Sequence, residues 1–293
     1  MKSAATSKPG ASIKPPAPIK AKATRKPSPA IKEAVIAPDD MLKVLELTKG
    51  SNSVEMKLNV SDKNRRGAYK GLGFDPVEAE PRQVFFFDTP DLDLNKAGVV
   101  VRARRSAGGM ADTVVKLRPV DPATLDRELR RSPGFKIEVD TMPGGFVCSA
   151  SLKGVCSAQD VLDVHKGKVP VESLFSKEQR AFYAANAPAG LALNDLSILG
   201  PTFQLRVKHQ PKDFDRRVTI EFWLYPDGSR IYELSTKALP KEAFQVAMLF
   251  KAYVAKCGIP LEKSVGTKTS SALSFFSKEL KQIAASAESE AVH

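Results

Sequence analysis

The chain has 293 residues, of which 42% are hydrophobic and 27% are charged. This composition is typical of a globular protein, and no apolar stretch is long enough to be a membrane-spanning helix. The three cysteines form no C-x-x-C pair and there are only three histidines, which argues against a disulfide framework, a thiolate zinc site or a histidine-rich metal site. We therefore predict a reducing, cytoplasmic location.

The net charge of +12 is concentrated at the N-terminus. Residues 1–38 contain eight lysine and arginine residues and one glutamate, so they carry seven of the twelve net charges. The same segment has seven prolines and no aromatic residue, and it cannot bury enough apolar surface to fold. We predict a disordered basic tail that contacts nucleic acid or polyphosphate without sequence specificity. A merely solubilising extension fits the same composition.

From Met41 onward, short segments alternate between apolar and polar residues, as the strands of an antiparallel sheet do. The first of them, 53–60, places Val54, Met56 and Leu58 on one face and Glu55 and Lys57 on the other. Further segments of this kind follow at 101–104, 115–118, 135–140, 203–208, 218–224 and 231–237.

The polar faces of these strands are unusually rich in charge. Their basic residues are Lys57, Arg102, Arg104, Lys116, Arg118, Lys136, Arg206, Lys208 and Lys237, and their acidic residues are Glu55, Glu138, Asp140, Glu221 and Glu233. Strands with one apolar and one charged face satisfy both by closing into a barrel with a charged lumen and helices outside. We therefore expect the lumen to be the binding site.

Three segments have the apolar spacing of helices that could cover such a barrel. They are 242–256, which ends before Gly258 and Pro260, a shorter segment at 174–185, and a terminal segment near 271–285. A further helical turn at 91–97 ends at Gly98.

The order of several motifs is also informative. They are Ser-Val-Glu-Met-Lys at 53–57, Phe-Phe-Asp-Thr-Pro at 86–90, Val-Arg-Ala-Arg at 101–104, Val-Lys-Leu-Arg at 115–118 and Lys-Ile-Glu-Val-Asp at 136–140, with 220–221, 232–233 and 266–269 further on. Over about 45–275 the sequence resembles a CYTH domain. Such domains belong to the triphosphate tunnel metalloenzymes, which include class IV adenylate cyclases, thiamine triphosphatases and inorganic triphosphatases.

The resemblance implies an α+β fold in which an antiparallel eight-stranded β-barrel, the triphosphate tunnel, has helices packed outside. The predicted organisation is a disordered tail at 1–38, a tunnel domain at 39–275, and a helix end and tail at 276–293.

The resemblance also implies which side chains hold a triphosphate and a Mg²⁺ or Mn²⁺ ion. The implied phosphate-binding residues are Lys57, Arg102, Arg104, Lys116, Arg118, Lys136, Arg206 and Lys208. The implied metal ligands are Glu55, Glu138, Asp140, Glu221 and Glu233. Glu138 and Lys57 are the implied catalytic residues.

Three positions depart from the family pattern. Where the family usually carries a carboxylate, this sequence has Ser53, Trp223 and Ser235. Fewer carboxylates weaken metal binding more than they weaken attraction for a polyphosphate.

Three functions therefore stay open. The first is metal-dependent hydrolysis of an inorganic, nucleoside or other organic triphosphate in the lumen. The second is binding of triphosphate or polyphosphate without turnover, with the basic tail adding avidity for a polyanion. The third is cyclisation of ATP, for which no residue here identifies a ribose site. No membrane partner is expected.

Overall fold

The computed structural model describes residues 38–261 and 268–291. The predicted tail therefore lies outside the described residues, apart from Pro38. Residues 38–293 form one unit. The helices in its described part are α1 (Pro38–Lys49), α2 (Arg65–Leu72), α3 (Asp93–Lys96), α4 (Arg127–Arg131), α5 (Ala158–His165), α6 (Lys177–Ala184), α7 (Ala243–Lys256) and α8 (Lys268–Ala291). The strands are β1 (Ser53–Val60), β2 (Glu80–Asp88), β3 (Val99–Ser106), β4 (Met110–Leu117), β5 (Phe135–Met142), β6 (Gly145–Ser157), β7 (Ser197–His209), β8 (Val218–Leu224) and β9 (Arg230–Ala238).

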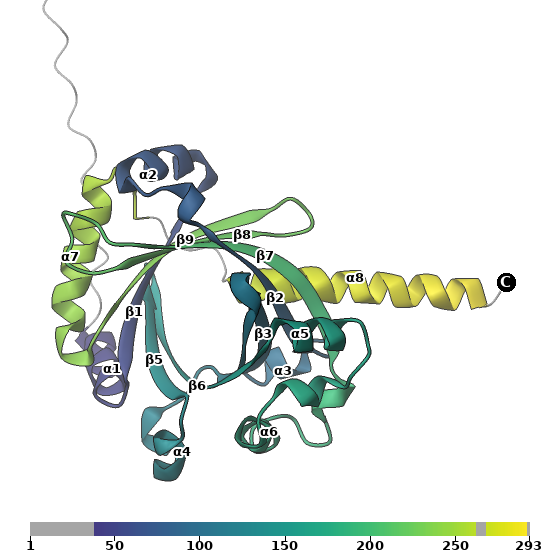
Figure 1. Cartoon of the computed structure of the whole chain (residues 1–293). Coiled ribbons are helices and arrows are strands. Elements are labelled where there is room, and N and C mark those ends of the chain that lie inside the picture. Colours follow the sequence, from purple (N-terminus) through teal and green to yellow (C-terminus); the bar gives the residue numbers. More distant parts are fainter. Residues whose placement is uncertain (1–37, 262–267, 292–293) are drawn as a thin grey trace, which may run out of the picture. The chain divides into compact units, whose positions relative to one another are not determined.

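The nine strands of the described part close into one barrel in the order β1-β5-β6-β4-β3-β2-β7-β8-β9 (Figure 1). β1 and β5 are parallel, and the other neighbouring strands are antiparallel. The predicted α+β barrel is confirmed, but the prediction of eight antiparallel strands is wrong. Strands cannot alternate in direction all the way around a closed ring of nine, so one parallel pair is required.

Two strands, β2 and β6, lack the alternation that reveals the others. β2 contains the apolar run 84–87, because both of its faces are buried. β6 is built from small residues, with Cys148 and Ala150 facing outward and Ser149 and Ser151 alternating with them. A pattern search for alternating large apolar and charged residues therefore misses both strands.

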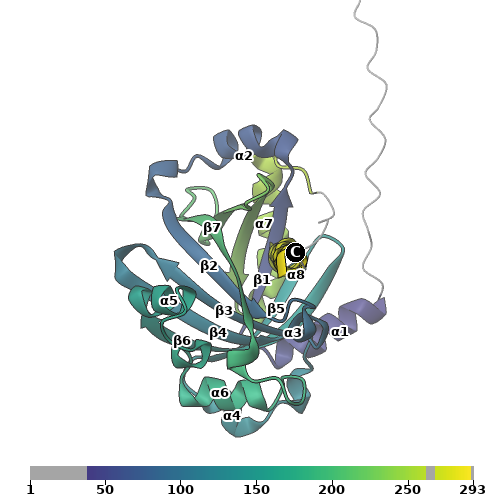
Figure 2. The same cartoon turned by 90° about the vertical axis from the view of Figure 1, so that its right-hand side faces the viewer.

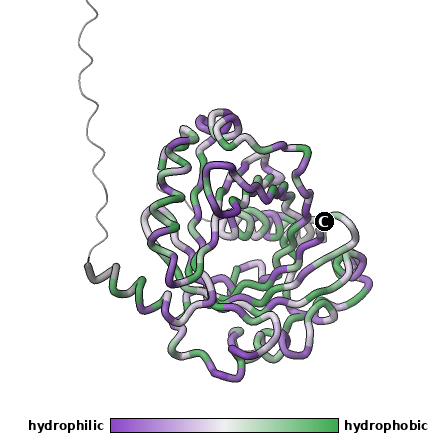
Figure 3. The backbone as a smooth tube through the Cα atoms, turned by 60° about the vertical axis from the view of Figure 1, so that its left-hand side comes forward, coloured by the Kyte–Doolittle hydropathy of each residue, from purple (hydrophilic) through white to green (hydrophobic). Residues whose placement is uncertain are grey.

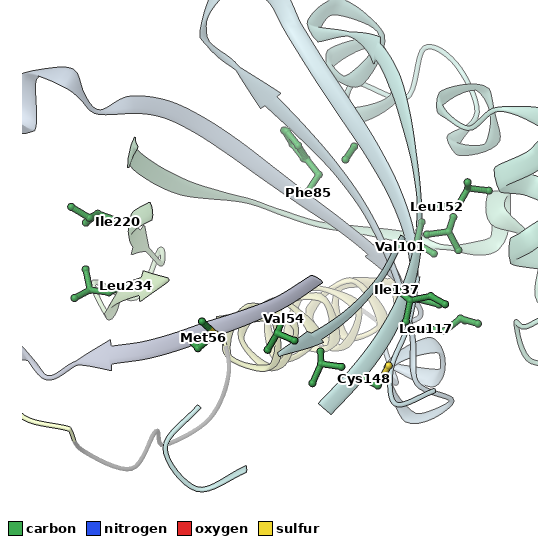
Figure 4. Packing of buried hydrophobic residues seen from close by; sticks show 14 of the residues in the cluster. Val54, Met56, Phe85, Val101, Leu117, Ile137, Cys148, Leu152, Ile220 and Leu234 are labelled. Atoms are coloured by element: carbon green, nitrogen blue, oxygen red, sulfur yellow. The ribbon is translucent and has the colours of Figure 1, made fainter. Parts of the chain in front are cut away.

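The apolar faces of the strands turn outward and form one core with the surrounding helices (Figure 4). α4 packs on β5, α5 on β3 and β6, α6 on β4 and β6, and α7 on β9. The predicted helix at 242–256 is α7, and its residues Val246, Phe250 and Val254 are buried. Hydrophilic and hydrophobic residues accordingly follow one another closely along the backbone (Figure 3). Among the described helices, none is both long and apolar enough to cross a bilayer.

α8 differs from the other helices because it begins at the mouth of the barrel (Figures 1 and 2). Its first turn lines the lumen, and its next residues pack on inward-facing residues of the strands. The buried members of this second core are Val84, Phe86, Leu199, Trp223, Tyr225, Ala272, Leu273 and Phe276. The expectation that all helices pack outside is therefore wrong for α8. The predicted domain boundary between residues 275 and 276 lies within this helix, and the domain division itself stays a prediction.

Removing the Phe276 side chain should loosen α8. Phe276 is 5% exposed and belongs to the same core as Trp223, the one tryptophan of the sequence. We expect Phe276→Ala to lower the free energy of unfolding by about 3 kcal/mol and to shift Trp223 fluorescence to longer wavelength. Ile283→Ala, on the exposed part of the same helix, should change stability by less than about 0.5 kcal/mol. Equal effects of the two substitutions in urea titrations would contradict the observed docking of α8.

Candidate functional site

A cavity of about 530 Å³ occupies the lumen of the barrel. Among the described residues that line it, nine are basic and five are acidic, so the lining carries a net charge of +4. A second hollow, of about 570 Å³, lies outside the barrel between α1 and the segment after β4, and three charged residues line it. The density of charge makes the lumen the candidate site.

The lumen brings together most of the residues predicted from sequence. Those that line the cavity are Glu55, Lys57, Arg102, Arg104, Lys116, Arg118, Glu138, Asp140, Arg206, Glu221 and Glu233. Lys136 and Lys208 do not line it, because they lie next to strand ends and their side chains are exposed. Lys237, Lys153 and Lys268 complete the basic lining.

Asp140 is the most deeply buried carboxylate of the cavity, at 1% exposure. It accepts a hydrogen bond from Lys57 Nζ at 2.8 Å, and Lys116 Nζ lies 3.6 Å from its other oxygen. Burial opposes the ionisation of Asp140, but the two ammonium groups outweigh it and hold the pKa of Asp140 well below its usual range. Burial lowers the pKa of Lys116 to about 8, although Asp140 partly offsets this effect.

Glu138, on β5, lies at a second place in the lumen, where side chains from β1 and β9 contact it. Lys237 donates a hydrogen bond to Glu138 Oε1, and Ser53 Oγ donates another at 3.2 Å. Burial would raise the pKa of Glu138, but the Lys237 ammonium outweighs it and lowers that pKa. Ser53, which replaces an expected carboxylate, therefore supports the carboxylate beside it.

Glu221 and Glu233 form a third place, directly opposite each other on β8 and β9. Both carboxylates contact Lys268 Nζ from α8, at 2.6 Å in the case of Glu233. Trp223 Nε1 donates a hydrogen bond of 3.1 Å to Glu221, and its ring centroid lies 5.2 Å from Lys268 Nζ. Trp223, the second residue that stands at an expected carboxylate position, thus contacts both Glu221 and Lys268. Ser235, the third, is buried opposite Lys57 in the β1–β9 register.

The arginines of the cavity are less fully paired than its lysines. Arg104 donates to Asp112 from Nε at 3.0 Å and from Nη2 at 2.7 Å, and Arg102 lies 3.9 Å from the same carboxylate. Within the described residues, the buried Nε atoms of Arg102 and Arg206 have no hydrogen-bond partner. Buried donors without partners are costly, so these two groups are suited to receive an anion.

Sequence reasoning missed Lys153 and Lys268, which line the cavity, and Asp112 and Arg82, which are charged neighbours of its arginines. Asp112 shares the two-residue alternation of Val114 and Lys116, a signal that could have identified it. Arg82 and Lys153 lie on β2 and β6, the two strands without clear alternation. Lys268 belongs to the motif at 266–269 that contributes to the resemblance, but nothing in that motif indicates that a helix would bring its side chain into the barrel.

The carboxylates of the lumen do not form one ready metal site. Within the described residues, no three carboxylate, histidine or cysteine side chains are grouped so that they could hold a metal ion. Glu221 and Glu233 nevertheless direct their oxygens at one cation, the ammonium of Lys268. Two carboxylates that converge on one positive charge fit a hard divalent cation, with the ammonium as its stand-in.

Solved structures share this fold, whereas no protein-family model and no curated protein matches the sequence. One is a Hippeastrum protein described as a proposed adenylyl cyclase with dominant triphosphatase activity. It is 17% identical, with a TM-score of 0.56 over 74% of this chain and 92% of that chain. Another is a proposed adenylate cyclase of Bacillus halodurans, 14% identical, with a TM-score of 0.51 over 74% of this chain and 95% of that chain. The chain therefore has the fold of these proteins, and the barrel predicted from its sequence is confirmed as that fold.

Proposed function

We propose that the lumen binds a triphosphate and that the protein hydrolyses it with the help of Mg²⁺ or Mn²⁺. The observation that carries this proposal is the net charge of +4 in the cavity of the barrel. It is suited to a ligand of about −4 to −5 that arrives with a cation. The described activity of the Hippeastrum protein, which has the same fold, supports the choice of triphosphate.

The arginines are the proposed main contacts of the phosphate oxygens. Arg102 and Arg206 each have an unused buried donor, and a guanidinium offers a planar fork that matches a phosphate group. Lys57, Lys116 and Arg118 line the same cavity and add positive charge to it. Lys136 and Lys208, which lie outside the cavity, are not proposed as contacts within it.

Glu221 and Glu233 would hold the divalent cation, with Glu55 and Asp140 as further candidate ligands. When bound, Mg²⁺ or Mn²⁺ would supply positive charge at the phosphate oxygens. Glu138, kept ionised by Lys237, would orient the attacking water through a hydrogen bond. The water oxygen would bond to the terminal phosphorus and give its proton to Glu138, while the bridging bond breaks and diphosphate leaves. Lys57 would stabilise the negative charge that the phosphoryl oxygens carry.

Binding without turnover is the second candidate function, and a specific observation favours it. Each of the five carboxylates of the cavity has a lysine within 4 Å, and three family carboxylates are replaced by Ser53, Trp223 and Ser235. A lumen whose own lysines neutralise its carboxylates holds a polyanion more readily than a second cation. ATP is a candidate substrate because both similar structures are described as proposed cyclases. Polyanion binding by the basic tail stays a prediction.

Phosphate release distinguishes the two functions. The full chain is assayed with inorganic triphosphate, ATP and thiamine triphosphate, in Mg²⁺, Mn²⁺ or EDTA. We expect metal-dependent release that falls by at least about 100-fold in Glu138→Gln, because the attacking water loses the carboxylate that orients it. Glu46→Gln, on exposed α1, is the control and should be fully active. Thermal stabilisation without phosphate release would establish binding alone, and cyclic AMP from ATP would establish cyclisation.

Two substitutions on β7 test the position of the ligand. Arg206 lines the cavity and Lys208, two residues further on, is exposed. We expect Arg206→Gln to weaken binding of inorganic triphosphate about 10- to 100-fold, the value of one charged hydrogen-bonding group. Lys208→Gln should change the affinity less than about twofold. Calorimetry in EDTA measures both, and equal losses would contradict binding in the lumen.

The affinity should also fall as the pH rises above about 8. Lys116 faces the carboxylates of Asp140 and Glu138 and the cations of Lys57 and Arg118, and its pKa is lowered to about 8 by burial. A bound polyanion favours the charged ammonium, so binding takes up a proton above this pH and weakens by up to about tenfold per pH unit. In Lys116→Arg, whose charge persists, this fall should disappear. Protonation of the ligand affects the wild type and Lys116→Arg equally. Parallel pH profiles of the two proteins would therefore contradict the assignment of the fall in affinity to Lys116.

A further inference from the structure

Lys268 occupies the position that a cation would take between Glu221 and Glu233. Its Nζ lies 2.6 Å from Glu233 Oε1 and also contacts Glu221 Oε2. The side chain of Lys268 is 20% exposed, that of Glu221 is 13% exposed and that of Glu233 is 9% exposed. At this depth, two facing carboxylates need a positive partner. The ammonium supplies that partner within the chain itself.

α8 holds this ammonium in place. Lys268 is the first described residue of α8, and Tyr225 donates a hydrogen bond of 2.9 Å to its carbonyl oxygen. One turn further on, Ala272 and Leu273 pack in the core that contains Trp223. These contacts fix the position from which the Lys268 side chain reaches the two carboxylates.

We propose that Lys268 is a built-in substitute for the divalent cation at Glu221 and Glu233, so that a metal ion binds there only when the ammonium leaves. The two cations would compete for the same carboxylate oxygens, and their mutual repulsion excludes joint occupancy at this distance. Lys268 also lines the cavity, where a bound phosphate chain offers its ammonium another partner. Triphosphate would then raise the affinity for metal, and by linkage metal would raise the affinity for triphosphate. This last step rests on the proposed function, whereas the competition does not.

The test is Mn²⁺ binding to the full chain without phosphate, measured by electron paramagnetic resonance. We expect Lys268→Met to bind Mn²⁺ about tenfold more tightly than the wild type, within the usual range for coupled sites. Lys268→Arg, which keeps the positive charge, should bind as weakly as the wild type. Lys153→Met is matched for net charge, because Lys153 lines the same cavity and makes no ion pair of 4 Å or less among the described residues. It should leave Mn²⁺ binding within about twofold of the wild type.

Equal Mn²⁺ affinity in the wild type and Lys268→Met would overturn the proposal, as would an equal gain in Lys153→Met. Trp223 fluorescence reports whether α8 stays docked in each variant, since the Trp223 side chain lies in the core that holds the helix. If Lys268→Met does not fold, a second comparison still tests the proposal. Tight Mn²⁺ binding by the wild type, abolished in Glu221→Gln, would overturn it. A separate titration with inorganic triphosphate identifies failure of the proposed function. Loss of triphosphate binding with the Lys268→Met gain intact would leave the competition standing.

Discussion

The enclosure of nine basic and five acidic side chains in one cavity is the constraint on which the rest of the structure depends. Charged groups removed from water are costly unless they are paired. In the lumen, lysine–carboxylate contacts such as those of Asp140 and Glu233 provide this pairing. Because the polar faces of the strands point into the lumen, their apolar faces must point outward. The helices that cover the barrel are a consequence of the charged interior.

The basic excess separates into two kinds of group. Most lysines of the lumen are already engaged by carboxylates, whereas Arg102 and Arg206 keep buried donors without partners in the described part of the chain. The lysines therefore neutralise the protein's own acids, and the arginines retain the capacity to receive a ligand. This division explains how a barrel whose cavity carries a net charge of +4 can be stable without a bound anion and can still attract an anion.

Trp223 stands where the resemblance predicts a carboxylate, and its side chain has two structural roles. The indole packs with Phe86, Leu273 and Phe276 in the core that docks α8, and its Nε1 supports Glu221. α8 in turn delivers Lys268 to Glu221 and Glu233. Trp223 thus helps to hold the helix that places the Lys268 ammonium between Glu221 and Glu233.

The sequence by itself determined which face of most strands is charged, because alternation is a local property: Glu55 and Lys57 share a face whatever lies next to them. It also identified the barrel and twelve of the fourteen charged residues that line the cavity in the described part of the chain. Only the tertiary structure decided that Lys136 and Lys208 lie beyond the cavity, that β2 and β6 complete a ring of nine strands in the described residues, and that Lys268 enters it. These features depend on strand register and helix docking, which arise from contacts between residues far apart in the chain and leave no periodic signal in the sequence.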